Sequence, residues 1–174
     1  RLCRIARDGA GTARKWTRQT LIAELWGVVR LKVASNYRRD VDLIQSFSIA
    51  GMADVSEEIV GFRVERPILE KSIMDRLAEC RLVNLSGLPG CGKSAMLKRI
   101  ASVDAASGPI LFLKSDRLEG SSWLRFTAAH GLQHRVVADL LAEIGSTGTP
   151  ILFIDGIDRI RPDQKGIITD ILRA

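Results

Sequence analysis

The sequence has few of the residues that build metal centres or disulfide frameworks. It contains three cysteines and two histidines in 174 residues. The cysteines, Cys3, Cys80 and Cys91, are odd in number and lack metal-ligand spacing, which indicates reduced thiols in a cytoplasmic protein rather than a disulfide scaffold. His130 and His134 could share a helix face, but no metalloprotease pattern surrounds them, so we expect two exposed polar side chains and no zinc site.

Long apolar runs are absent as well. None approaches the roughly 20 apolar residues that a membrane-spanning helix needs, so we expect no membrane partner. Hydrophobic residues still make up 46% of the chain, which at this length can supply one domain with a core and a short extension. The chain begins with Arg1 rather than Met, so we expect the natural N-terminus to lie upstream. The presence of a signal peptide therefore cannot be judged from this sequence.

The net charge of +6 is confined to the first part of the chain. Residues 1–50 contain ten Lys/Arg and four Asp/Glu, whereas residues 51–174 contain sixteen of each. Such a basic segment can bind nucleic acid or an acidic partner. Neither a compact basic cluster nor an aromatic ladder accompanies the charge, so a solvated helical face is the favoured interpretation and a nucleic-acid partner is the weaker one.

One glycine-rich segment carries a phosphate-binding pattern. It follows the Walker A form G-x-x-x-x-G-K-[ST], in the order Gly87, Leu88, Pro89, Gly90, Cys91, Gly92, Lys93 and Ser94. The apolar run 82–85 predicts a strand before it, and the helical spacing of apolar residues in 96–101 predicts a helix after it, ending near Asp104. Strand, glycine loop and helix together favour a nucleotide site over an ordinary glycine-rich turn.

The physical basis of this prediction is anion binding by the backbone. Glycines permit backbone angles at which successive N–H groups converge on phosphate oxygens, and the following helix adds its free N–H groups and positive dipole end. We expect Lys93 to reach the β- and γ-phosphates and Ser94 to place its hydroxyl on Mg²⁺. The full set expected to bind the nucleotide is Gly87, Pro89, Gly90, Cys91, Gly92, Lys93, Ser94 and Ala95.

A second motif offers a metal partner for this loop. The apolar run 150–155 predicts a central strand of a parallel sheet, buried on both faces, that ends in Asp155. A carboxylate at the C-terminal end of such a strand lies at the edge where α/β sheets bind ligands. We expect Asp155 to be the Walker B acid that holds Mg²⁺ directly or through water. A plain strand end followed by an Asp-Gly turn at Gly156 is the alternative.

The residues after Asp155 are more ambiguous. Asp158 could orient or activate an attacking water, which would make it catalytic beside Lys93 and Asp155. A solvated loop acid or a helix cap is an equal alternative for Asp158. We expect Arg159 and Arg161 to be surface charges.

The remaining pattern alternates helices with strands. Helical spacing covers 17–44 with a break at Ser35–Asn36, and a linker is expected at 51–58. A helix after Pro67 is expected to bury a stripe formed by Ile68, Leu69, Ile73 and Leu77. A strand at 109–114, a helix at 135–144 and a final helix after Pro162 complete the prediction. This alternation predicts a parallel α/β sheet with right-handed crossovers.

Three segments resemble the additional-strand class of P-loop NTPases, in particular the AAA+ and STAND (NACHT-like) ATPases. They are the Walker A loop, the string Asp155-Gly156-Ile157-Asp158, which is similar to a D-G-φ-D Walker B motif, and the segment 60–66. Segment 60–66 is similar to an hhGR-x-x-E element that often packs near the adenine. The resemblance covers about 59–174 and implies a three-layer α/β/α core with ATP and Mg²⁺ as ligands. The absence of an N-K-x-D guanine-reading motif agrees with ATP rather than GTP.

The resemblance also implies a function and a division of the chain. We expect a helical N-terminal segment with a linker at 1–55 and a P-loop NTPase domain at 56–174, of whose five core strands three are present. Sensor residues and an arginine finger are then expected beyond Ala174. The implied activity is Mg-dependent ATP hydrolysis as a molecular switch, with a protein partner or self-association.

Two alternatives to this switch remain. Phe62 stands where the family's element prefers glycine, and Arg159 stands where an acidic pair is usual. The first alternative is therefore a nucleotide-binding scaffold with little turnover. The second is a DNA-associated AAA+ ATPase, which the basic N-terminal segment motivates.

Overall fold

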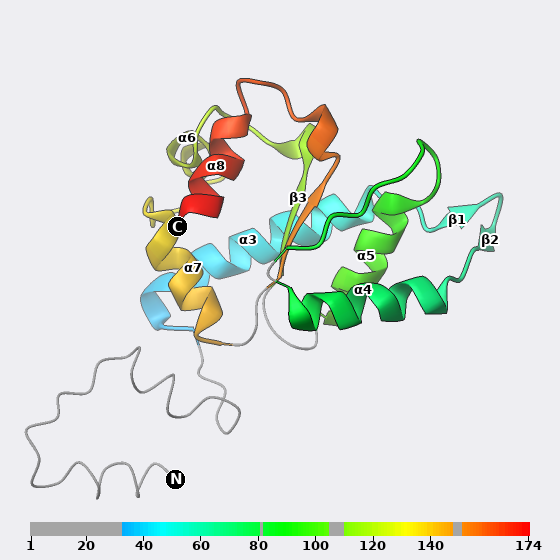
Figure 1. Cartoon of the computed structure of the whole chain (residues 1–174). Coiled ribbons are helices and arrows are strands. Elements are labelled where there is room, and N and C mark those ends of the chain that lie inside the picture. The colour runs from blue at the N-terminus through cyan, green and yellow to red at the C-terminus, as the bar shows by residue number, and fades with distance from the viewer. Residues whose placement is uncertain (1–32, 81, 105–109, 148–150) are drawn as a thin grey trace, which may run out of the picture.

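The computed structural model describes residues 33–80, 82–104, 110–147 and 151–174 (Figure 1). Its elements are α3 (Ser35–Ala53), β1 (Glu58–Ile59), β2 (Phe62–Arg63), α4 (Pro67–Glu79), α5 (Lys93–Asp104), β3 (Leu111–Lys114), η2 (Ser115–Arg117), α6 (Trp123–Ala129), α7 (Val137–Gly145), β4 (Leu152–Asp155), η3 (Ile157–Arg159) and α8 (Lys165–Arg173). The expected basic arm and the helical spacing from residue 17 fall mainly on residues outside these ranges.

A small parallel sheet lies at the centre of the described structure. β3 pairs with β4 from Leu111 opposite Leu152 to Lys114 opposite Asp155. Successive side chains of a strand point to opposite faces. Leu111 accordingly belongs to a buried cluster with α6, α7 and α8, whereas Phe112 belongs to a second cluster with α4 and α5. Helices therefore lie on both sides of the sheet (Figure 1), in agreement with the expected α/β class.

Helix α3 covers the outer edge of β3. Ser48 on α3 is buried, and its Oγ accepts a hydrogen bond from Phe112 N at 3.0 Å and donates to Ile110 O at 3.0 Å. These bonds satisfy backbone groups that an edge strand would otherwise expose. Val41 and Ile44 on the same helix join the cluster around Leu111. Described residues on both sides of the expected boundary at 55/56 thus share one core, while the division into two domains stays a prediction.

The strand predicted at 82–85 is wrong. No ladder includes this segment, so the described residues contain two core strands rather than three. Val83 and Leu85 still pack against the cluster around Phe112, whereas Leu82 is 81% exposed. The apolar run thus marks a segment that packs on the core, but strand formation also needs a hydrogen-bonding neighbour, which local sequence does not specify.

Helices α4, α5, α7 and α8 and strands β3 and β4 lie close to their predicted positions. The β1–β2 hairpin and helix α6 were not predicted, and three further expectations need correction. Residues 35–36 begin α3, and the helix expected before them lies outside the described residues, so the break there is untested. Helix α3 extends to Ala53 and includes the first three residues of the expected linker, 51–53. A Cβ added to Gly51 would lie 3.5 Å from Phe112 Cδ1. On α4 only Ile73 of the predicted stripe is buried, and Ile68 is 87% exposed.

The third correction concerns the histidines, which are half-buried rather than exposed. His130 packs against Phe47 and Phe126, and burial lowers its pKa although the nearby Glu119 carboxylate opposes that shift. His134 stacks on Tyr37, with 3.9 Å between ring centroids.

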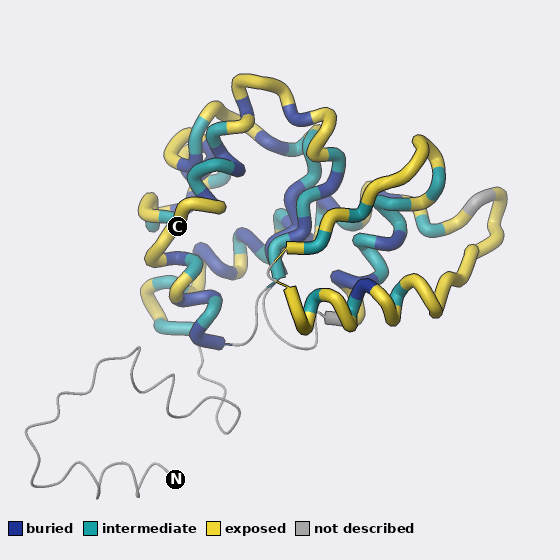
Figure 2. Tube along the Cα trace, viewed as in Figure 1, coloured by how far each residue is buried: buried dark blue, intermediate teal, exposed yellow. Residues whose placement is uncertain are grey.

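The exposed surface is concentrated away from this core. Figure 2 shows exposed residues along the β1–β2 hairpin and one side of α4, and buried residues at β3. The hairpin turns at Val60 and Gly61, which both have positive φ as a tight two-residue turn requires. In the described part of the chain, no helix is long and apolar enough to cross a membrane.

A buried carboxylate joins α3 to the loop between α6 and α7. Asp40 accepts hydrogen bonds from the backbone N–H groups of Gln133 and His134, the latter at 2.7 Å, and lies 2.8 Å from His134 Nδ1. Burial by itself raises the pKa of Asp40, but the hydrogen bonds and the imidazole together outweigh burial. The net pKa therefore lies below its ordinary value, and folding stabilises the charged form.

We expect Asp40→Asn to lower the free energy of unfolding at pH 7 by about 2 kcal/mol, because two backbone N–H donors lose a buried, charged acceptor. The folded-state pKa is depressed, so the contribution of Asp40 is present above the unfolded-state pKa and is lost as pH falls through the folded value, below about pH 4. Urea unfolding at pH 7 and at pH 3 measures both effects. Asp42→Asn changes an exposed carboxylate on the same helix and is the control; equal losses in the two variants would refute this role.

Candidate functional site

The glycine loop adopts the conformation that its residue types permit. Gly90 has φ 76° and Gly92 has φ 85°, both in the left-handed region that other residues rarely adopt. The N–H of Cys91 donates to Leu88 O at 3.3 Å inside the loop. Helix α5 then begins at Lys93, so its free N–H groups and positive dipole end lie directly after the loop, as predicted.

The Lys93 ammonium folds back onto the loop. Its Nζ donates to Gly87 O at 2.8 Å and to Leu88 O at 2.9 Å, and lies 3.9 Å from Cys91 Sγ. These oxygens are neutral carbonyls, which bind an ammonium more weakly than phosphate oxygens do. The loop therefore holds its cation by contacts that an anion can replace or supplement.

The two predicted motifs meet in space. Ser94 Oγ donates a hydrogen bond to Asp155 Oδ1 at 2.7 Å, although the residues are 61 positions apart. Asp155 is the last residue of β4 and is 7% exposed, whereas Ser94 lies in the first turn of α5. Parallel strand ends and the N-terminus of α5 thus converge at one edge of the sheet, where α/β folds bind ligands.

The segment after Asp155 leaves the sheet through a turn that has a left-handed glycine. Gly156 has φ 70°, and a Cβ there would lie 2.6 Å from Ser115 Oγ, so this position requires glycine both for its angles and for space. The short helix η3 follows and presents Asp158 and Arg159 to solvent. Within the described ranges Asp158 makes no hydrogen bond or ion pair with Ser94, Asp155 or any other residue.

A wide cleft of about 2110 Å³ includes these motifs. Its lining contains the loop, the start of α5 and the strand ends, among them Lys93, Ser94, Asp155 and Asp158. Ala95 also lines the cleft, whereas Cys91 is absent from the lining and contributes its backbone to the loop.

Sequence reasoning missed one lysine of the cleft, Lys114. It ends β3 opposite Asp155, and its Nζ lies 2.7 Å from Asp116 Oδ2 and 3.7 Å from Asp54 Oδ2. The hydrogen bond from Arg117 lowers the pKa of Asp54, and Lys114 adds to that shift. Lys114 could have been predicted as a site residue because it is a charged residue at the end of the apolar run 109–114.

Arg66 is the second residue of the cleft to which the sequence analysis gave no role of its own, although it is the last residue of segment 60–66. Its Nη1 donates to Cys91 O at 2.7 Å, so its guanidinium lies against the glycine loop. The signal was weak, because Arg66 precedes Pro67 as one more charged residue in a polar turn.

The donor set fits a hydrated magnesium ion and a phosphate chain. A serine hydroxyl and a carboxylate in contact are oxygen ligands of the kind that Mg²⁺ prefers, and Mg²⁺ usually takes only one or two of them from the protein. In the described residues no cluster of three or more His, Cys, Asp or Glu could hold a metal by itself. The phosphates would therefore complete the coordination.

Comparison with known families gave one match. The model of the family described as "ATPase family associated with various cellular activities (AAA)" matches residues 83–172, more than half of the chain and including both motifs. No curated protein and no solved structure matches the chain significantly.

We expect Gly156→Ala to lower the free energy of unfolding by about 1–3 kcal/mol, because alanine is strained at this positive φ and its Cβ meets Ser115. Thermal unfolding followed by circular dichroism measures the change. Gly145→Ala is the matched control, since this helical glycine has open space around it and should be neutral or slightly stabilised. A stable Gly156→Ala variant would show that the turn after Asp155 is not constrained.

Proposed function

This chain belongs to the AAA family of ATPases, and we propose that it binds Mg·ATP at the loop 87–94 and hydrolyses it as a nucleotide-dependent molecular switch. The observation that carries the proposal is the 2.7 Å hydrogen bond between Ser94 and Asp155. It brings the expected Walker A serine into contact with the expected Walker B acid, so the two side chains could hold one Mg²⁺ together. A STAND-type, NACHT-like subclass is part of the same proposal and rests on segments 60–66 and 155–158.

The roles of the residues follow from their positions. Backbone N–H groups of the loop and of the first turn of α5 bind the phosphate oxygens, and Lys93 neutralises the β- and γ-phosphates as it moves from its carbonyl partners. Ser94 and Asp155 hold Mg²⁺, which when bound supplies charge neutralisation on the phosphates. Catalysis in such a site consists mainly of positioning and electrostatic stabilisation.

The attacking water needs a further group. Asp158 is the candidate from this chain, because it lies on η3 directly after Asp155 and lines the same cleft. Its carboxylate is exposed and has no polar partner among the described residues, so it is free to orient a water in the cleft.

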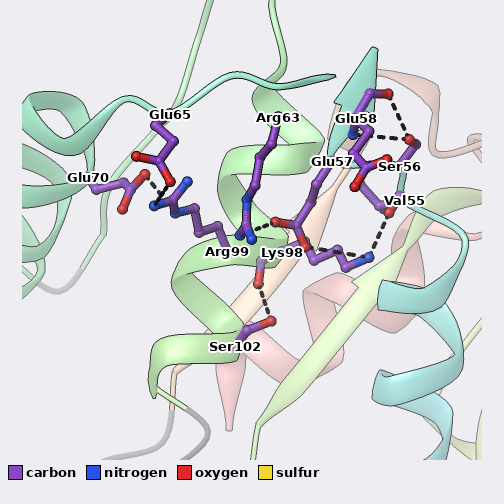
Figure 3. Close-up of polar contacts among 10 residues, drawn as sticks. All are labelled: Val55, Ser56, Glu57, Glu58, Arg63, Glu65, Glu70, Lys98, Arg99 and Ser102. Carbon is purple, nitrogen blue, oxygen red and sulfur yellow. Dashed lines mark hydrogen bonds and ion pairs between the residues drawn. The ribbon is translucent and has the colours of Figure 1, made fainter. Parts of the chain in front are cut away.

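The contacts of α5 support the switch. Lys98 donates to Val55 O at 2.8 Å and lies 3.6 Å from Glu57, which also binds Arg63 of the hairpin (Figure 3). The helix that begins at Lys93 thus contacts the segment after α3. We propose that nucleotide binding at one end of α5 biases this segment.

Two observations favour the scaffold alternative. Asp158 has no polar partner among the described residues, and Arg159 follows it in place of an acid. A site that binds ATP with little turnover would have this appearance. The DNA-associated alternative depends on the basic N-terminal segment and stays a prediction.

We expect Lys93→Ala to weaken Mg·ATP binding by about 100-fold or more while the fold is retained, because the lysine ammonium contacts only loop atoms and its loss leaves the phosphates without their main cation. Isothermal titration calorimetry with Mg·ATP and Mg·GTP measures this, and wild type should prefer ATP.

Lys165→Ala removes an exposed lysine outside the cleft and is the control. Retained affinity in the Lys93→Ala variant would show that the loop is not the nucleotide site.

We expect Asp155→Asn to reduce the rate of ATP hydrolysis by about 100-fold while ATP affinity changes by less than about tenfold, because the loop and Lys93 still bind the phosphates. Phosphate release assayed at saturating Mg·ATP measures the rate, and Asp158→Asn measured in parallel tests the water-orienting role. Wild-type protein that binds ATP without phosphate release would favour the scaffold, and an unchanged rate in Asp155→Asn would contradict the Walker B assignment.

A further inference from the structure

Arg66 lies at the glycine loop although it belongs to neither Walker motif. It is the residue directly before α4, and its Nη1 donates to the carbonyl oxygen of Cys91 at 2.7 Å. The point where a Cβ of Gly92 would stand lies 3.8 Å from Arg66 Nη2 and 3.9 Å from Nη1. The guanidinium therefore lies beside the last two loop residues before α5 begins.

The charge of Arg66 has no carboxylate partner in the part of the chain that the structure describes. The two acidic residues nearest to it in sequence are directed elsewhere: Glu65 and Glu70 lie 3.9 Å and 2.8 Å from Arg99 on α5 (Figure 3). Arg66 itself is exposed and lines the same cleft as Lys93. Its position therefore does not result from an ion pair.

The chemistry of the guanidinium suits an anion at this place. A neutral carbonyl engages one of its several N–H donors, and the others remain available. The planar arrangement of these donors matches two oxygens of a phosphate group. Glu65 and Glu70 are bound to Arg99, which reduces their competition for Arg66.

We propose that Arg66 is a second cationic ligand of the nucleotide's phosphate chain, supplied from the junction between the hairpin and α4 and acting beside Lys93. This inference rests on the proposed nucleotide site. Arg66 raises affinity for the phosphate chain, and a bound nucleotide holds the start of α4 against the loop.

The test compares Mg·ATP binding by the full chain in four forms: wild type, Arg66→Gln, Arg66→Lys and Arg76→Gln. Arg76 is an exposed arginine on α4, the helix that follows Arg66, and lies outside the cleft, so its variant removes the same charge elsewhere. We expect Arg66→Gln to raise Kd about tenfold, Arg66→Lys to retain part of the affinity, and Arg76→Gln to bind like wild type. Circular dichroism melting of each variant checks that the fold is retained.

Salt dependence separates a ligand from a structural residue. If Arg66 contacts phosphate, the slope of log Kd against log salt concentration is shallower in Arg66→Gln than in wild type, and Arg66→Lys restores it. A tenfold loss with an unchanged slope would mean that Arg66 only supports the loop through the Cys91 carbonyl, and would overturn the inference.

The same measurements distinguish this inference from the proposed function. Wild-type affinity in Arg66→Gln, together with lost binding in Lys93→Ala, overturns the role of Arg66 and leaves the nucleotide site standing. A folded wild type that binds no Mg·ATP overturns both.

Discussion

The parallel pairing of β3 with β4 is the constraint on which the rest of the structure depends. It sets Lys114 beside Asp155 at one edge of the sheet, and it divides the apolar side chains between two clusters on opposite faces. Helix α5 packs on one of those faces, and its first turn therefore reaches Asp155 through Ser94. Helix α3 protects the outer edge of β3 through Ser48, so the site lies on a sheet whose exposed backbone is partly satisfied.

The two cationic side chains at the glycine loop make hydrogen bonds that phosphate oxygens could replace. Lys93 and Arg66 both bind backbone carbonyl oxygens of the glycine loop rather than carboxylates. Hydrogen bonds to neutral carbonyls are weaker than those to anionic oxygens, so a phosphate chain can take over these donors with a net gain. Asp155 differs, because this buried acid already holds a serine hydroxyl. These contacts support the proposed binding of a phosphate chain and of Mg²⁺ at this site.

The features of the site that could be predicted from the sequence are those set by residues close together in the chain. The glycine conformations, the start of α5 and the strand that ends in Asp155 follow from turn chemistry, helix periodicity and an apolar run, each within about ten residues. Arg66 and Lys114 could not be predicted in the same way, since their positions depend on which distant segments lie beside them. The apolar run 82–85 shows that a local pattern can also mislead. Its pattern suits a strand, but no neighbouring strand pairs with it.

The sequence by itself determined the α/β class, the glycine-rich loop with its lysine and serine, and the strand that ends in Asp155, because these depend on short-range backbone geometry and on residue chemistry. Only the tertiary structure decided that Ser94 touches Asp155, that α3 joins the core of the sheet, that both histidines are half-buried and that Arg66 lies over the loop. The physical reason is that contacts between distant segments come from packing and from loop closure, whose free energies no local pattern contains.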